Sequence, residues 1–212
     1  MVIGLSGVAG AGKDLFFSLL SKRLNCLKFS LADALKSEVG LFSYPQYGID
    51  PLNCSREEKD IIRPLLVMHG TFKRSQSEGR HWIEKMNKKI LLNNINDSIV
   101  VITDIRYDDY PKDEVFWLKE ELDGVLIHIS MYEELPRLNG KHKEFVQPIN
   151  KEEERNDPKL KSQADYTVEW KKAKNDKEKE LEPYIDGFIS WLNGEENRLS
   201  AYKKAENARV RR

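Results

Sequence analysis

The chain lacks several features that would place it in particular classes of protein. Its 212 residues include only two cysteines, Cys26 and Cys54, whose spacing is not that of a metal-binding motif. So few cysteines exclude a small disulfide-rich scaffold and indicate reduced thiols in a reducing compartment. No apolar run is long enough to span a membrane, and the first residues enter an apolar segment without a signal-like sequence. We therefore expect a cytoplasmic protein with no membrane partner.

An excess of charge of either sign is also absent. Lys and Arg number 35 and Asp and Glu number 35, which gives a formal net charge of zero. This balance argues against a nucleic-acid coat protein or a polybasic membrane binder, although it allows a local basic cleft. The length predicts one domain, which we expect over residues 1–193, followed by a polar tail over residues 194–212.

A glycine-rich segment is the most informative feature that is present. The sequence Gly-Val-Ala-Gly-Ala-Gly-Lys-Asp at residues 7–14 follows an apolar run and precedes an amphipathic stretch. This order predicts a strand, a loop and a helix, which is the context of a P-loop whose backbone N–H groups bind phosphate. The predicted phosphate-binding residues are Gly7, Gly10, Ala11, Gly12, Lys13, Asp14 and Leu15. The ammonium group of Lys13 would contact the β- and γ-phosphates of a bound nucleotide.

Asp14 stands where the common motif has Ser or Thr, whose hydroxyl binds Mg²⁺. A carboxylate is also a hard oxygen ligand, so Asp14 is a candidate magnesium ligand. An acid in the first turn of a helix is equally well explained by the helix dipole. Both interpretations stay open.

Strand and helix patterns alternate along the chain. Strands are expected at residues 2–6, 27–30, 98–103, 124–129 and 164–168, and helices at residues 14–24, 31–41, 55–67, 81–92 and 110–122. Pro64 lies inside one helical pattern and predicts a kink or a boundary there. This alternation predicts an α/β domain with a mainly parallel sheet flanked by helices.

Two segments differ from that core in composition. Residues 131–161 are polar and contain three prolines, which is typical of a mobile lid over a phosphate site, or of a solvated loop without a role. Apolar residues between Leu181 and Leu192 share one helical face, so we expect that helix to pack on the core. After Gly194 we expect a frayed, solvated helix.

Polar residues follow the clearest buried strand. Asp104 and Arg106 come directly after residues 99–103, and open α/β sheets bind ligands at the carboxyl ends of their strands. Asp104 is therefore a candidate for holding Mg²⁺ or its water shell, or alternatively a cap for the next turn. Arg106 could contact phosphate.

Taken together, these motifs resemble the deoxynucleoside monophosphate kinases of tailed bacteriophages. The resemblance covers about residues 1–170 and is carried by residues 5–14, 29–36, 63–71, 82–83, 101–106, 153–156 and 164–166. It implies a P-loop NTPase fold of the nucleoside monophosphate kinase type with a mobile lid. It also implies transfer of the γ-phosphate of ATP to a (deoxy)nucleoside 5′-monophosphate with Mg²⁺, in the host cytoplasm if the protein is phage-encoded.

The resemblance also assigns roles to residues. The implied catalytic residues are Lys13, Arg63, Asp104, Arg106 and Arg155. The implied substrate-binding residues are Asp33, Arg63, Gly70, Thr71 and Trp82. The implied metal ligands are Asp14 and Asp104, although Leu15 stands where a Thr is common in that family.

Other functions share this fold. A P-loop kinase acting on a modified base in phage DNA, or on a small metabolite such as a coenzyme precursor, differs mainly in its acceptor pocket. A guanine-specific switch would carry an Asn/Thr-Lys-x-Asp segment after a late strand, whereas Ser-Met-Tyr-Glu follows Ile129 here. We expect small-molecule nucleotides as partners, no stable nucleic-acid partner and possible homodimers.

Overall fold

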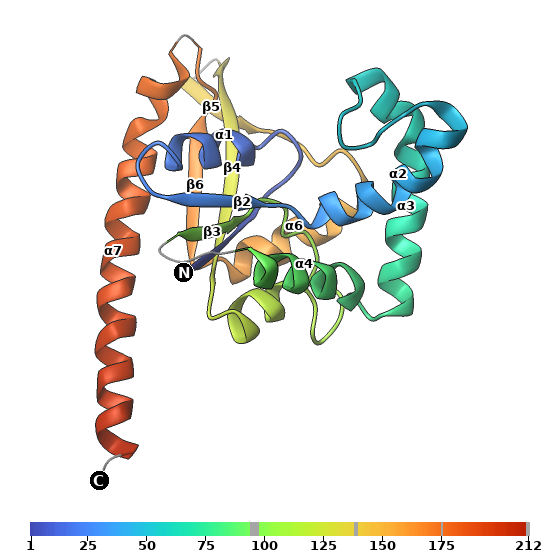
Figure 1. Cartoon of the computed structure of the whole chain (residues 1–212). Coiled ribbons are helices and arrows are strands. Elements are labelled where there is room, and N and C mark those ends of the chain that lie inside the picture. Colours follow the sequence, from blue (N-terminus) through green and yellow to red (C-terminus); the bar gives the residue numbers. More distant parts are fainter. Residues whose placement is uncertain (94–97, 138–139, 175, 211–212) are drawn as a thin grey trace.

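A six-stranded sheet forms the centre of the molecule (Figure 1). The computed structural model describes residues 1–93, 98–137, 140–174 and 176–210, without side-chain detail for residues 137, 140 and 195–210. The strands are β1 (Val2–Ser6), β2 (Cys26–Phe29), β3 (Ile99–Ile102), β4 (Val125–Arg137), β5 (Gly140–Phe145) and β6 (Tyr166–Lys171).

The sheet is mostly parallel, as the alternating pattern predicts. Its order is β2-β3-β1-β4, with all three of these pairings parallel. β6 also pairs in parallel with β4, while β5 pairs in an antiparallel manner with the far end of β4. The carboxyl ends of β1 and β3 therefore lie next to each other, and the segments that follow them meet at one edge of the sheet.

Helices cover both faces of this sheet. They are α1 (Lys13–Leu20), α2 (Leu31–Tyr47), α3 (Arg56–Gln76), α4 (Arg80–Leu92), α5 (Glu114–Phe116), the π-helical turn η1 (Trp117–Glu121), α6 (Lys151–Gln163) and α7 (Lys177–Val210). Figure 1 shows α2 and α3 projecting on one side of the sheet and α7 running along the other. Of the described residues, no helix combines the length and the apolar character needed to cross a membrane.

Alternation along the central strands divides the core into two layers. On β3, Val100 and Ile102 join the cluster beneath α4 and η1, whereas Val101 joins the cluster beneath α1 and α7. On β4, Leu126 belongs to the first cluster and Ile127 to the second. Successive side chains of a strand point to opposite faces, so apolar residues at consecutive positions require cover on both faces.

The structure bears on two expectations about local structure. Helix α3 continues through Pro64, so the expected boundary is wrong and a kink stays a prediction. Pro64 lies on the exposed face, where water can replace the lost backbone hydrogen bond. The polar segment 131–161 contains the end of β4, strand β5 and most of helix α6, so the expectation of a solvated loop is wrong, while the mobile lid stays a prediction.

The ends of other elements also differ from the expected ones. The pattern at residues 110–122 becomes helical only from Glu114, through α5 and η1. Helix α7 runs across Gly194 to Val210, so residues 194–210 are helical as expected, and their fraying stays a prediction. The helix packs on the core through Leu181, Ile185, Phe188 and Leu192, as expected. Residues 211–212 lie outside the described residues.

Candidate functional site

The loop of residues 7–12 joins β1 to α1 and has a backbone that only glycine adopts easily. Gly7, Gly10 and Gly12 have φ values of 128°, 85° and 94°. A Cβ atom on Gly12 would lie 2.5 Å from the Trp170 ring, and one on Gly7 would lie 2.2 Å from the carbonyl oxygen of Ile129. The glycines therefore allow the loop to press against β4 and β6.

The sheet also anchors this loop through hydrogen bonds. The indole Nε1 of Trp170 donates to the carbonyl oxygen of Ala11 at 2.9 Å, and Ala11 itself is fully buried. Gly12 precedes α1 and provides no side-chain cap. The N–H groups in the first turn of α1 are thus available to an anion, on which the helix dipole also acts favourably.

Lys13 folds back over the loop. Its Nζ donates to the carbonyl oxygens of Gly7 at 2.5 Å and Val8 at 2.9 Å. Burial, and next the positive charge of Arg106, lower the pKa of Lys13 to about 8, against the opposing effect of nearby carboxylates. The electrostatic coupling shows that the ends of β1 and β3 bring these two cations near each other.

Arg106 is exposed, and no carboxylate pairs with its guanidinium among the described residues. Two cations near each other repel, and an anion between them would relieve that repulsion. The arrangement at the glycine loop is therefore suited to a polyanionic ligand.

The two predicted metal ligands have protein partners. Asp104 accepts hydrogen bonds from the Ser30 hydroxyl at 2.8 Å and from the backbone N–H groups of Leu31 at 2.8 Å and Ala32 at 2.9 Å. It thus caps the N-terminus of α2. Asp14 is largely exposed and pairs with Lys28 at 2.6 Å. Within the described ranges, no three His, Cys, Asp or Glu side chains are grouped to hold a metal ion.

Helix α6 contacts the loops that follow both β1 and β3. The Glu153 carboxylate accepts from the N–H of Ala9 at 3.2 Å, and Glu152 accepts from the Tyr107 hydroxyl at 2.9 Å. Arg155 pairs with Asp109 at 2.9 Å and lies 58% exposed. The predicted catalytic Arg155 is therefore engaged with the loop after β3.

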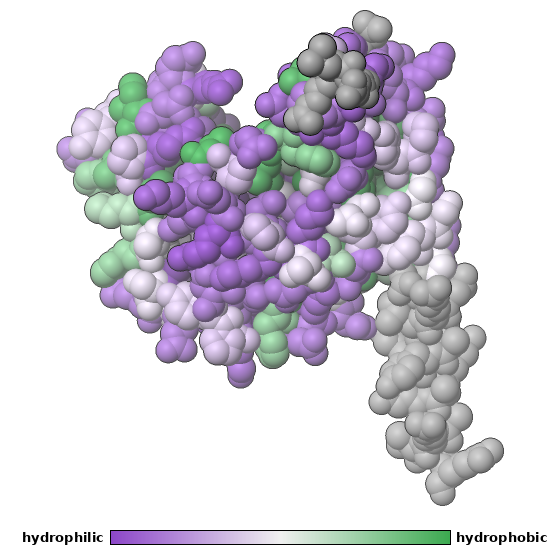
Figure 2. All heavy atoms as spheres, turned by 180° about the vertical axis from the view of Figure 1, so that it is seen from behind, coloured by the Kyte–Doolittle hydropathy of each residue, from purple (hydrophilic) through white to green (hydrophobic). Residues whose placement is uncertain are grey.

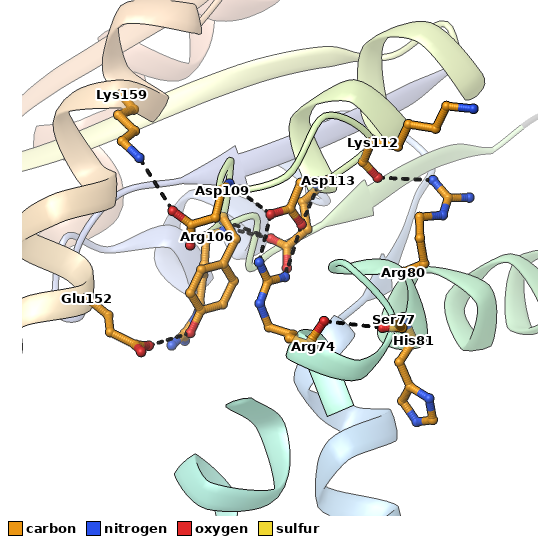
Figure 3. Close-up of polar contacts among 12 residues, drawn as sticks. Arg74, Ser77, Arg80, His81, Arg106, Asp109, Lys112, Asp113, Glu152 and Lys159 are labelled. Atoms are coloured by element: carbon orange, nitrogen blue, oxygen red, sulfur yellow. Dashed lines mark hydrogen bonds and ion pairs between the residues drawn. The ribbon is translucent and has the colours of Figure 1, made fainter. Parts of the chain in front are cut away.

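A buried polar cluster lies beneath the loop after β3 (Figure 3). Arg74 of α3 makes two hydrogen bonds with Asp113 and one with Glu114. Glu114 accepts from the backbone N–H groups of Arg106 at 2.6 Å and Tyr107 at 3.1 Å. No sequence pattern indicated a role for Arg74 or Glu114, because Arg74 lies 39 positions from Asp113 and 40 positions from Glu114.

The other predicted site residues lie on α2, α3 and α4. Arg63 is half-exposed and pairs with Asp60, and Thr71 is exposed. Asp33 pairs with Lys36 at 3.7 Å and with Lys89 at 3.5 Å.

Two of these predicted residues are buried. Gly70 packs against Leu35, and a Cβ atom added to Gly70 would lie 3.2 Å from the Leu35 side chain. Trp82 is 5% exposed and packs against the rings of His69 and His81, so it is mainly a core residue. Among the described residues, the predicted substrate-binding side chains of α2, α3 and α4 form no hydrogen bond or ion pair with the glycine loop.

Figure 2 shows a notch between the lobe of α2 and α3 and the part of the molecule that carries β4 and β5. Hydrophobic residues lie along its base, and hydrophilic residues cover most of the surrounding surface. The chain matches no model of a known protein family, and no curated protein is significantly similar to it.

Proposed function

We propose that this protein is a nucleoside monophosphate kinase, which transfers the γ-phosphate of ATP to a deoxynucleoside 5′-monophosphate. One observation carries the proposal. A glycine-rich loop between β1 and α1 holds the Lys13 ammonium at the carbonyl groups of Gly7 and Val8, where burial and the nearby charge of Arg106 lower the pKa of Lys13 to about 8. Such a loop with two convergent cations suits a nucleoside triphosphate. The sequence resemblance to bacteriophage deoxynucleoside monophosphate kinases supports the same reaction.

The residues present suit this chemistry. In the proposed reaction an oxygen of the acceptor monophosphate bonds to the γ-phosphorus, the bond from that phosphorus to the bridging oxygen breaks, and ADP leaves. A monophosphate dianion needs no general base, so positioning and neutralisation of charge dominate. Lys13 would neutralise the β- and γ-phosphates, and Arg106 would contact the transferred group.

Magnesium would accompany ATP in this proposal. A nucleotide-bound Mg²⁺ takes most ligands from phosphates and water and needs only one or two carboxylates. Asp104 fits such a role, because a carboxylate has about four lone-pair sites and three are used by the cap of α2. Asp14 is exposed beside Lys13 and is the second candidate.

On the basis of the resemblance, we assign the binding site of the acceptor monophosphate to the lobe formed by α2 and α3. Arg63 on this lobe is the proposed cation for the monophosphate, since its side chain is half-exposed and its pairing with Asp60 is local and weak. The formal net charge of the chain is zero, and this favours a small anionic acceptor over a nucleic acid.

A substrate screen tests the proposal. The protein is incubated with ATP, Mg²⁺ and each common ribo- and deoxynucleoside 5′-monophosphate, and ADP release is measured. We expect release that depends on at least one monophosphate and falls several-hundred-fold in Lys13→Ala, since one lost charge contact in a transition state costs about 3–4 kcal/mol. Acceptor-dependent ADP release that survives in a folded Lys13→Ala variant would contradict the assignment.

A further inference from the structure

Arg74 is a buried cation that the proposed reaction does not use directly. It lies on α3 and is 7% exposed. Its two terminal nitrogens bind both oxygens of Asp113, at 3.0 and 2.7 Å, and one of them also binds Glu114 at 3.2 Å. Asp113 is fully buried and Glu114 is 3% exposed. A buried charge cluster of this kind adds little net stability, because desolvation offsets the attraction. Its presence therefore calls for another explanation.

The two carboxylates also fasten the backbone of the loop after β3. One oxygen of Glu114 faces Arg74, and the other accepts from the N–H groups of Arg106 and Tyr107. Asp113 similarly accepts from the N–H of Asp109 at 2.9 Å. The guanidinium thus fixes two acceptors, and these acceptors fix the conformation of the segment that carries Arg106.

The same guanidinium is stacked on an aromatic ring. Its central carbon lies 3.7 Å from the centre of the Tyr107 ring, and the Tyr107 hydroxyl donates to Glu152 of α6. Figure 3 shows Arg74 between the loop and α3, with Glu152 on the far side of the loop. Arg74 and the Tyr107 ring that it stacks on therefore connect α3, the Arg106 loop and α6.

Electrostatics explains why this link needs Arg74. Burial raises the pKa of Glu114, and the positive charge of Arg74 opposes that increase. Without the guanidinium, the pKa of Glu114 would rise further, and its side chain would favour the neutral form more strongly or move toward water. Either change would weaken the acceptor that holds the N–H of Arg106.

We propose that Arg74 is a positioning residue, which acts through Glu114 to hold the backbone of Arg106 beside Lys13. The role given to Arg106 rests on the proposed kinase function, whereas the tie between Arg74 and the loop does not. Arg74 thereby couples α3 to the segment that carries Arg106.

The test uses Arg74→Lys, which keeps the charge and loses the planar fork and the stacking. Hydrogen exchange of the full-length protein is measured at the amides of residues 106–109, with the amides of β3 as the internal reference. Steady-state kinetics with ATP and the best acceptor are measured in parallel. We expect faster exchange confined to this loop, a kcat lower by ~10–100-fold and a KM for ATP within about threefold of the original value.

Arg80→Lys is the matched control. Arg80 also forms ion pairs, with Glu84 and Glu121, and binds the carbonyl of Lys112, but it makes no contact with Glu114 or Arg106 among the described residues. It should change neither the exchange of residues 106–109 nor kcat. Glu114→Gln serves as the second variant if Arg74→Lys does not fold. Its carboxamide is a weaker acceptor, so it should show the same changes to a smaller degree.

The outcomes separate the two proposals. Unchanged loop exchange in a folded Arg74→Lys or Glu114→Gln variant would overturn the positioning role, whatever the activity. Faster loop exchange with unchanged kcat would overturn it as well, because Arg106 would then need no such support. If the unmodified protein transfers phosphate to no acceptor, the kinase proposal fails, and the exchange result still decides whether Arg74 holds the loop.

Discussion

The carboxylate of Glu153 accepts a hydrogen bond from the backbone N–H of Ala9 at 3.2 Å, across 144 positions of the sequence. The same oxygen accepts from the N–H of Ile149 at 3.3 Å, so it is held at the start of α6. Ala9 lies in the glycine loop. In the proposed function, a carboxylate therefore lies where a phosphate oxygen of ATP would bind, and the two negative groups compete.

Removing the charge of Glu153 should therefore strengthen ATP binding. We expect Glu153→Gln to lower the Kd for ATP by about fivefold at pH 7, the equivalent of about 1 kcal/mol for one charge-assisted hydrogen bond. Isothermal titration measures the Kd. Glu154→Gln, an exposed neighbour on the same helix, is the control and should leave the Kd unchanged. Weaker ATP binding in Glu153→Gln would show that the carboxylate assists the nucleotide instead of competing with it.

The lowered pKa of Lys13 predicts a pH dependence of stability. Its folded-state pKa of about 8 lies below the ordinary value of 10.5, so the unfolded chain binds more protons between these pH values. Lys13 should therefore make the folded protein more stable as the pH rises from about 8 to 10.5. The free energy of unfolding in urea, compared between the original protein and Lys13→Met, isolates this effect. A difference that stays constant between pH 7 and 10.5 would contradict the lowered pKa.

Nucleotide binding should reverse that shift. Triphosphate oxygens favour the charged form of Lys13, so ATP should raise its pKa and bind together with protons near pH 8–9. Calorimetric titrations in buffers of different ionisation enthalpy measure the proton uptake, and Lys13→Met should abolish it. Equal uptake in both proteins would assign the proton to another group.

Asp104 should affect both stability and magnesium use. Asp104→Asn weakens the acceptors for Ser30, Leu31 and Ala32, so we expect a loss of about 1–3 kcal/mol of unfolding free energy. The proposed kinase should also need more Mg²⁺ for half-maximal rate, because an amide is a weaker ligand. Chemical denaturation and a Mg²⁺ titration measure the two effects. Asp14→Asn is the control for stability, since exposed ion pairs contribute little. Lower stability with unchanged Mg²⁺ dependence would limit Asp104 to capping α2.

Glu38 of α2 joins the proposed acceptor lobe, α2 and α3, to helix α4. Burial acts to raise its pKa, but hydrogen bonds from Lys85, His69 and His81 outweigh this and lower the pKa to about 2. Its contribution to stability is thus complete above about pH 4.5 and is lost as the pH falls toward 2. Glu38→Gln should destabilise the protein at pH 7 by about 2 kcal/mol, whereas Glu84→Gln, at an exposed pair, should change little. Equal effects in thermal unfolding would show that the cluster does not hold the lobe.

The sequence predicts the centre of the fold better than its periphery. Apolar strands between turn signals identify β1, β3 and β4, because both faces of a parallel sheet are buried. Strand β5 was not predicted, since its Gly-Lys-His-Lys-Glu-Phe sequence is polar at most positions and it pairs at the edge of the sheet. Its pairing comes from the neighbouring end of β4, which composition does not reveal.

Proline was a poor guide to helix ends in this chain. Four prolines lie inside helices, namely Pro45, Pro64, Pro158 and Pro183. All four are exposed, where solvent can satisfy the carbonyl group that loses its partner. The local sequence does not show which face of a helix a residue will occupy after folding.

The sequence likewise predicts only part of the candidate site. Contiguous motifs indicated the glycine loop, Lys13, Asp104 and Arg106, and the structure brings these residues into one region. Arg74 was missed because its partner Asp113 is 39 positions away, and a single Arg on a helix is usually solvated. The cap of α2 by Asp104 depends likewise on a contact that forms only when β2 pairs with β3.

Transfer of labelled phosphate tests the central claim most directly. The protein is incubated with ATP labelled at the γ-phosphate, Mg²⁺ and either the four common deoxynucleoside 5′-monophosphates or duplex DNA, and the labelled products are separated. We predict labelled deoxynucleoside diphosphate, abolished in Lys13→Ala, and no label in DNA. Label in DNA or in neither acceptor, from a protein that is folded and binds ATP, would contradict the account.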